Sequence, residues 1–186
     1  MALTATIHQF EIDLADADRG VYESLALRAA RHPSESAEYL VARVLAYALE
    51  FAPGIGFSGG GVSDPDEPPI AVRDLTGAIT SWIEIGSPDA ARLHKASKTS
   101  PRVAVYTHKD PERLVRNLAG ERIHRADALE IYAIDRALVA ALASRLERRM
   151  AFALGVSGRE LFVSIGDETL TGRISSVRAE DGRGHA

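Results

Sequence analysis

Three charged side chains, Asp66, Glu84 and Lys95, have sequence surroundings that indicate chemistry. Asp66 lies in a segment rich in proline and glycine, Glu84 lies inside the apolar run 79–85, and Lys95 follows in the next predicted helix. A carboxylate in an apolar strand is costly to desolvate, so Glu84 should be buried beside a cation, a metal ion or several hydrogen-bond donors. Two carboxylates supply the oxygen ligands that Mg²⁺ or Mn²⁺ prefers. A lysine beside such an ion offsets the charge that develops on a phosphate in the transition state.

Glu84 also has a simpler interpretation, which is a buried salt bridge with Lys95 or Arg92. Lys98, three residues after Lys95, is the second candidate for the cation of a catalytic site. A carboxylate inside a strand needs a partner, but that partner need not take part in catalysis. The residues alone therefore leave both interpretations open.

A second pair of acids, Glu35 and Glu38, lies near the predicted start of a helix. Residues three apart share one face of a helix, so both side chains can reach the same site. Glutamates in the first turn also simply favour the helix dipole, and this is the preferred interpretation of Glu35.

Other common site chemistries are disfavoured by residue type and spacing. The chain has no cysteine, which excludes disulfides, thiolate zinc sites and a cysteine nucleophile. Its histidines show no His-x-x-x-His or His-Glu pairing, so a zinc site is not expected. The glycines of 54–61 are not followed by Gly-Lys-Ser/Thr, and Ser58 lacks the Gly-x-Ser-x-Gly spacing. A nucleotide-binding loop and a catalytic triad are therefore not predicted.

Composition sets the broad class of the protein. The chain has 186 residues, the usual size of one domain, and a formal net charge of −4. An acidic chain does not grip phosphate backbones with its whole surface, so any nucleic-acid contact must be local. No export signal and no apolar run of roughly 18 residues is present, which predicts a cytoplasmic protein without a membrane partner. The sequence makes no prediction of oligomeric state.

Hydrophobic periodicity and capping residues predict the elements that must position these side chains. The predicted strands are 4–14, 79–85, 102–107 and 128–134, and 150–156 with 160–165 form a hairpin. The predicted helices are 19–31, about 35–49 with Ser34 as its cap, one opened by Ser87-Pro88-Asp89, one from Asp110-Pro111 to Gly120, and 135–148. Segment 54–69 is predicted to be a strand end and an exposed loop. Such alternation predicts an α/β fold in which a mixed sheet is flanked by helices.

Several short motifs together resemble the YaeQ family of small bacterial proteins. They are Met1-Ala2-Leu3 with Ala5-Thr6-Ile7, Ala30-Arg31-His32-Pro33-Ser34-Glu35, Asp66-Glu67-Pro68, and Trp82-Ile83-Glu84-Ile85-Gly86 with Pro88-Asp89 and Lys95. The fold of that family looks like the PD-(D/E)XK nuclease superfamily, so the resemblance implies a restriction-endonuclease-like core. It covers nearly the whole chain, with residues 1–175 as a single domain and 176–186 as a disordered tail.

The superfamily resemblance also implies a site. A helix glutamate, another acidic residue and a strand Glu-x-Lys ring a divalent metal in that superfamily, which assigns these roles to Glu38 or Glu35, to Asp66 and to Glu84. Asp66 and Glu84 would then hold Mg²⁺ or Mn²⁺.

The lysine of the superfamily motif is missing here, because Gly86 stands at its position. Lys95, or less favourably Lys98, would return an ammonium group from the following helix, a migration that the superfamily tolerates.

Two functions are consistent with these features. The leading hypothesis is a metal-dependent phosphodiesterase or nuclease-like protein with Glu38, Asp66, Glu84 and Lys95 as its catalytic residues. The alternative is a non-catalytic module that binds nucleic acid or protein on a nuclease scaffold, with a link to transcription that the resemblance suggests. Nucleic acid is the partner expected of the first, and nucleic acid or protein of the second; a purely structural interaction protein is a third interpretation.

Overall fold

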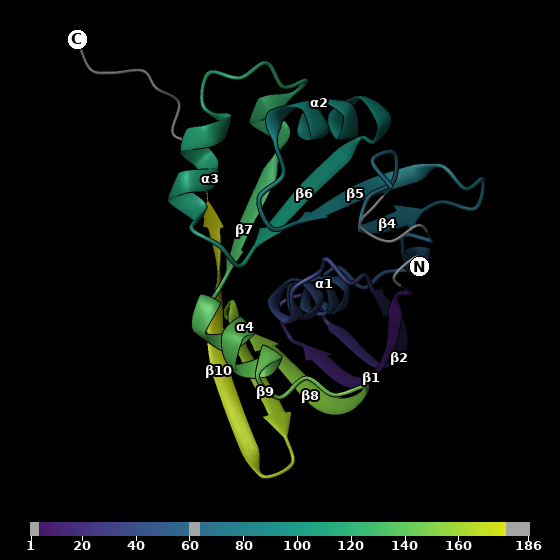
Figure 1. Ribbon diagram of the computed structural model, residues 1–186, viewed down its shortest axis with the longest axis vertical. Coiled ribbons are helices and arrows are strands. Elements are labelled where there is room, and N and C mark those ends of the chain that lie inside the picture. The colour runs from purple at the N-terminus through teal and green to yellow at the C-terminus, as the bar shows by residue number, and fades with distance from the viewer. Residues whose placement is uncertain (1–3, 60–63, 178–186) are drawn as a thin grey trace.

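One mixed sheet of ten strands forms the frame of the protein, in the order β2-β1-β8-β9-β10-β7-β6-β5-β4-β3 (Figure 1). The computed structural model describes residues 4–59 and 64–177. The strands are β1 (Thr6–Asp16), β2 (Val21–Arg31), β3 (Ile55–Phe57), β4 (Ile70–Arg73), β5 (Ile79–Ile85), β6 (Arg102–Thr107), β7 (Glu130–Ile134), β8 (Arg149–Ser157), β9 (Glu160–Ile165) and β10 (Glu168–Val177). The fold is therefore mixed α/β, as predicted.

The helices occupy both sides of this strongly curved sheet. They are α1 (Ala37–Leu49), α2 (Ala90–Thr99), α3 (Pro111–Leu118) and α4 (Arg136–Ala143). α1 lies in the hollow of the sheet, and α2 and α3 lie against the opposite face of β5, β6 and β7 (Figure 1). Among the described residues, no helix is long and apolar enough to cross a bilayer.

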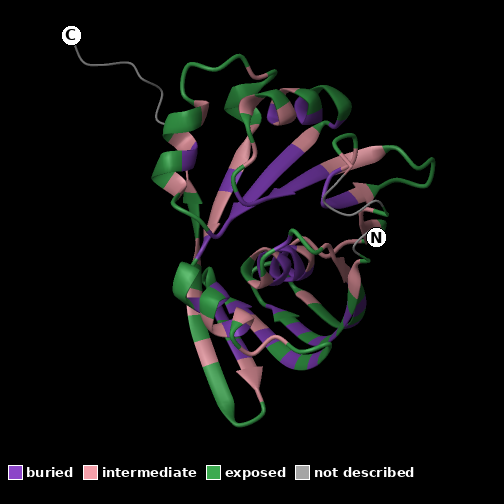
Figure 2. Cartoon of the chain, in the orientation of Figure 1, coloured by how far each residue is buried: buried purple, intermediate pink, exposed green. Residues whose placement is uncertain are grey.

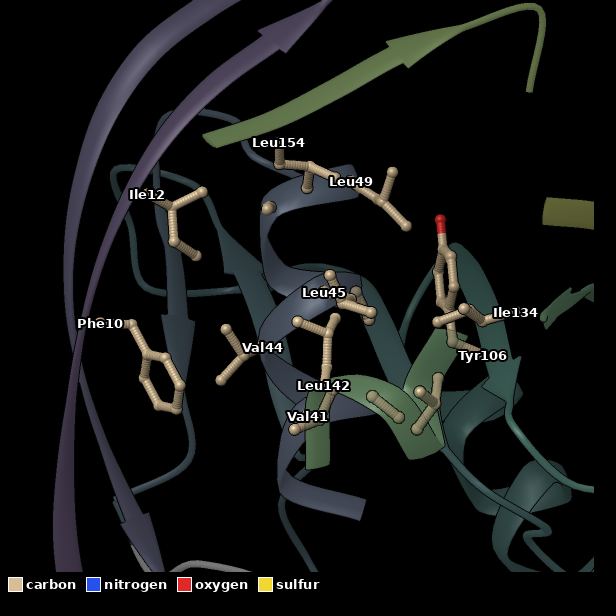
Figure 3. Packing of buried hydrophobic residues seen from close by; sticks show 14 of the residues in the cluster. Phe10, Ile12, Val41, Val44, Leu45, Leu49, Tyr106, Ile134, Leu142 and Leu154 are labelled. Carbon is tan, nitrogen blue, oxygen red and sulfur yellow. The ribbon is translucent and has the colours of Figure 1, made fainter. Parts of the chain in front are cut away.

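The main core surrounds α1. Ser36 caps this helix by accepting a hydrogen bond from the amide of Tyr39, and most of the residues that follow are buried. A helix that is apolar on nearly all sides must be enclosed, and the curved sheet encloses it. Figure 3 shows α1 side chains such as Val44 and Leu45 among side chains of β1, β6, β7, β8 and α4.

Burial along the strands follows from this layering. In β1 every second residue is buried, because one face meets α1 and the other meets water. In β6 almost every residue is buried, because helices cover both faces (Figure 2). The strands 79–85 and 102–107 were predicted from their apolar residues, and both are confirmed.

The predicted helix over 19–31 is wrong. This segment forms β2, which pairs antiparallel with β1 along its whole length. Leu25, Leu27 and Ala29 are the buried positions, and their spacing of two is the strand period rather than the helix period. The following helix begins after Ser36 instead of Ser34, since it is the Ser36 side chain that accepts the capping hydrogen bond from the amide of Tyr39.

β10 was also not predicted. It pairs with β9 through 168–173 and with β7 through 174–177, so it joins the two halves of the sheet. Its residues are mostly polar and exposed, which hides the strand pattern. The tail expected over 176–186 overlaps β10 at Ser176 and Val177, and the rest of it lies outside the described residues.

β5, β6 and β7 are parallel neighbours, and their carboxyl ends meet at one edge of the sheet. The segments that leave this edge begin with Gly86, His108 and Asp135. In open α/β sheets ligands bind in the crevice beyond such ends, which directs attention to this edge.

We expect Leu45→Ala to lower the free energy of unfolding by about 2–5 kcal/mol, because it empties space in the middle of α1 that its surroundings cannot fill. Urea denaturation of the two proteins measures the difference. Leu75→Ala is the matched control, since Leu75 is fully exposed and should change stability by less than about 0.5 kcal/mol. Equal effects of the two substitutions would contradict the position of α1 at the centre of the core.

Candidate functional site

Glu84 is the buried acid that the sequence pattern predicts, with only 3% of its surface exposed. Its Oε1 accepts a hydrogen bond of 2.7 Å from Trp82 Nε1 and another of 2.6 Å from Arg92 Nε. Trp82 and Glu84 are two residues apart in β5, so their side chains leave the same face of the sheet, toward α2. Burial raises the pKa of Glu84, and the hydrogen bonds from Trp82 and the charge of Arg92 oppose that rise.

Arg92 is therefore the cation of this acid, which confirms the simpler interpretation of a salt bridge with Arg92. The same guanidinium donates from Nη1 to the carbonyl of Pro65 at 3.1 Å and from Nη2 to the carbonyl of Glu67 at 2.8 Å. Its Cζ also lies 5.8 Å from the ring centroid of Trp82. One arginine of α2 thus connects β5 with the loop that carries Asp66.

Asp66 and Lys95 pair with each other instead of with Glu84. Both are exposed, with 72% of the Asp66 side chain and 48% of the Lys95 side chain open to solvent. Lys98 is exposed on the same helix. An exposed pair of this kind contributes little to stability and exchanges readily with water and ions.

The two glutamates near the start of α1 have different environments. Glu35 is buried ahead of the helix, where its Oε2 accepts hydrogen bonds from the amide of His32 at 3.0 Å and from Arg43 Nη2 at 3.3 Å. Burial raises the pKa of Glu35, and Arg43 opposes the rise. Glu35 is thus one half of a buried ion pair rather than a first-turn helix acid. Glu38 is exposed in the first turn of α1.

A cavity of about 330 Å³, which we call the Glu84 cavity, opens at the carboxyl ends of β5 and β6. It is lined by Tyr39, Glu67, Pro69, Glu84, Ile85, Gly86, Ser87, Pro88, Arg92 and Lys109. Oε1 of Glu84 accepts both hydrogen bonds to this carboxylate. Oε2 accepts none from the described residues and is therefore available to a ligand.

His108 and Lys109 complete this edge, and sequence reasoning missed them. The His108 side chain is buried, with 4% exposed, and neither ring nitrogen has a hydrogen-bond partner within the described part of the chain. Gly86 has a φ of +85°, and a β-carbon there would lie 4.0 Å from His108 Cε1. Their position in the sequence could have identified them, because both residues directly follow the carboxyl end of a predicted strand.

The arrangement does not fit the predicted Mg²⁺ or Mn²⁺ site. Within residues 4–59 and 64–177, no three His, Asp or Glu side chains are grouped closely enough to hold a metal ion. Of the residues expected around the ion, Glu84 binds Arg92 and Asp66 binds Lys95. Glu38 stands on α1, where its charge acts on His108.

We expect Arg92→Met to destabilise the protein strongly, by about 3 kcal/mol or more, because it leaves Glu84 buried without its cation. Adding Glu84→Gln should recover part of that loss, with a coupling energy of about 1–3 kcal/mol in a double-mutant cycle measured by urea denaturation. Lys95→Met is the control, since removal of an exposed pair should cost less than about 1 kcal/mol. Additive effects of Arg92→Met and Glu84→Gln would contradict the central place of this pair.

His108 makes the stability of the protein depend on pH, because burial lowers the pKa of its imidazole below the ordinary value of 6.5. As the pH falls through 6.5, the imidazole is protonated in the unfolded chain before it is protonated in the folded chain. The contribution of neutral His108 to stability is therefore complete above pH 6.5 and is lost as the pH falls toward the pKa of the folded state. His108→Leu should therefore show a smaller drop in melting temperature between about pH 7 and pH 5. The exposed His124 supplies the control His124→Leu, which should keep the full drop.

The chain is similar to YaeQ proteins in sequence and in structure. The family model described as YaeQ protein matches residues 1–174. The YaeQ protein of Escherichia coli (strain K12) is 38% identical over 108 residues, which span 58% of this chain and 59% of that protein. The YaeQ protein of Salmonella typhi matches with the same identity and coverage. The chain thus spans less than two thirds of the length of these relatives.

Two crystal structures extend the likeness to the fold. YaeQ protein from Pseudomonas syringae superposes with a TM-score of 0.83 at 29% identity, covering 95% of this chain and 97% of that one. YaeQ protein from Xanthomonas axonopodis pv. citri gives a TM-score of 0.83 at 31% identity, covering 95% and 99%. Since the family model spans nearly the whole chain and both structures share its fold, the chain belongs to the YaeQ family.

Proposed function

We propose that the protein binds nucleic acid by its phosphate backbone at the Glu84 cavity, as a binding module on a nuclease-like scaffold. The observation that carries this proposal is the ion pair of Glu84 with Arg92, because it compensates the buried negative charge of the cavity. Lys109 lines the same cavity and forms no ion pair within the described residues. A cavity with a compensated acid and a free ammonium favours an anionic ligand.

Glu67 does not reverse this balance, although it lines the cavity. Its Oε2 accepts a hydrogen bond of 2.9 Å from Ser58, and its Oε1 lies 3.9 Å from Arg73 Nη2. Only its backbone carbonyl binds Arg92. The carboxylate of Glu67 is thus held by residues on the side of β3 and β4.

The likeness of the YaeQ family to PD-(D/E)XK nucleases is part of the proposal and supplies the class of ligand. In this chain Gly86 replaces the strand lysine of that superfamily, and Lys95 binds Asp66. These departures support a protein that keeps a surface for nucleic acid without the arrangement for cleavage. The net charge of −4 restricts the contact to this edge of the sheet.

A metal-dependent phosphodiesterase is the second candidate, and one observation favours it. Oε2 of Glu84 is available in the cavity, whereas the Asp66–Lys95 pair is exposed and weak. Release of the Asp66 side chain from Lys95 would free a second carboxylate at low energetic cost.

Binding is tested by fluorescence anisotropy with labelled single-stranded DNA and RNA over a range of salt concentrations. We expect salt-dependent binding by the wild type. Lys109→Ala should weaken it about three- to tenfold and reduce the slope of log K against log salt by about 0.7, the value of one phosphate contact. Lys98→Ala is the matched control, because Lys98 is an exposed lysine that does not line the Glu84 cavity. Absence of any salt-dependent binding would contradict the proposal.

Cleavage of the same oligonucleotides with Mg²⁺ or Mn²⁺ decides between the two candidates. The binding module predicts intact oligonucleotides with the wild type. Metal-dependent cleavage that disappears in Glu84→Gln and Lys95→Ala, at unchanged melting temperature, would replace the module with the phosphodiesterase. Cleavage that persists in both variants would indicate a contaminating nuclease.

A further inference from the structure

A second cavity lies beside the Glu84 cavity at the carboxyl ends of β6 and β7. Its volume is about 350 Å³, and it is lined by Lys109, Asp110, Pro111, Ala133, Ile134, Asp135, Arg136, Arg173 and Ser175. Lys109 lines both cavities, so the two adjoin at this residue. Neighbouring strands are about 4.8 Å apart, which places the second cavity roughly one strand further along the same edge.

Three cations from three different segments line the second cavity. Lys109 follows β6, Arg136 begins α4, and Arg173 lies in β10. All three are exposed, and none forms an ion pair with an acidic side chain of the described residues. Cations that surround one hollow without carboxylate partners repel one another, and an oxyanion between them relieves that repulsion.

The two acids of the lining, Asp110 and Asp135, cap helices and form no ion pair with the three cations, so cationic side chains outnumber acidic ones in the lining. Asp110 accepts hydrogen bonds from the amides of Glu112 and Arg113 at the start of α3, and it lies 4.0 Å from Arg116. Asp135 accepts a hydrogen bond from the amide of Ala137 at the start of α4. Both carboxylates are thus directed to the first turns of helices.

The backbone holds Arg173 and Arg136 in fixed places. The amide of Asp135 donates to the carbonyl of Arg173 at 2.9 Å, where β10 changes its partner from β9 to β7. A β-carbon on Gly172 would lie 2.8 Å from Leu138 Cβ and 3.1 Å from Asp135 Cβ, so α4 packs directly on the backbone of β10. The close packing fixes the backbone positions from which the two arginine side chains extend.

His108 is a buried neighbour of these cations. It directly precedes Lys109, and both Lys109 and Arg136 lie close enough for their charges to act on it. Its imidazole is 4% exposed and has no hydrogen-bond partner among the described residues. Buried polar groups are normally satisfied, so this imidazole is an exception, but it lines neither cavity and the proposal below does not rest on it.

We propose that the second cavity is a phosphate site formed by Lys109, Arg136 and Arg173, which holds a phosphate group next to the one at the Glu84 cavity. This inference rests on the proposed function and deepens it, since the strand would cross from one cavity to the other over Lys109. The recognised chemistry is a phosphate oxyanion, from a nucleic-acid backbone or from free phosphate.

The test uses the double variant Arg136→Gln/Arg173→Gln in the full chain. With labelled single-stranded oligonucleotides, we expect at least a tenfold weakening of binding and a salt slope reduced by about 0.7 for each phosphate that the variant no longer binds. Arg148→Gln/Arg149→Gln removes the same charge from exposed positions that line neither cavity and should bind like the wild type. Arg136→Lys/Arg173→Lys should recover part of the binding, which excludes misfolding as the cause.

Inorganic phosphate is the second probe and separates the two sources. Its effect on the melting temperature is compared with that of sodium chloride at equal ionic strength. If the wild type binds oligonucleotides and the double glutamine variant binds them equally well, the second phosphate site is wrong while the proposed function stands. If oligonucleotides do not bind but phosphate stabilises the wild type and not the double variant, the site takes free phosphate and the proposed function is wrong. If neither probe distinguishes the double variant from the wild type, the inference is overturned.

Discussion

The burial of α1 is the constraint on which the rest of the structure depends. The helix is apolar on nearly every side, so a flat layer of strands could not cover it. The sheet covers it by curving, with β1 and β8 below and β5 and β6 above (Figure 1). This curvature gives β5, β6 and β7 one face toward α1 and the other toward α2 and α3. The cavities open where these three strands end, and the Glu84 cavity lies beside Tyr39 in the first turn of α1.

The electrostatics of that edge follow from a few buried or anchored groups. Arg92 compensates Glu84 and also binds two carbonyls of the neighbouring loop, so one guanidinium satisfies a buried acid and fixes a loop. Arg43 likewise pairs with the buried Glu35 and donates one further hydrogen bond to the carbonyl of Ala30 in β2. With these acids paired, the cavities keep three cations without an acidic partner among the described residues, namely Lys109, Arg136 and Arg173, and this supports the proposed phosphate recognition.

Much of the frame was predictable from the sequence, whereas the grouping of side chains was not. The apolar strands 79–85 and 102–107 and the cap at Asp110 carry strong local signals, and the buried state of Glu84 followed from its apolar neighbours. β10 was missed because it is polar. Segment 19–31 was mistaken for a helix because it lacks glycine and proline after Gly20. The approach of Arg136 to Arg173 depends on the meeting of α4 with β10, which no local pattern encodes.

The double pairing of β10 also bears on how the chain is made. Its first residues complete the lower part of the sheet and its last residues complete the upper part, so the two parts are separate until 168–177 is available. β1 likewise waits for β8, as Ile12 pairs with Phe152. Contacts this distant in sequence form slowly, and here they involve the last of the described strands to leave the ribosome. The hairpin of β1 and β2 therefore lacks β8 through most of synthesis, and of its partners only α1, which follows it directly, is present early to cover its apolar face.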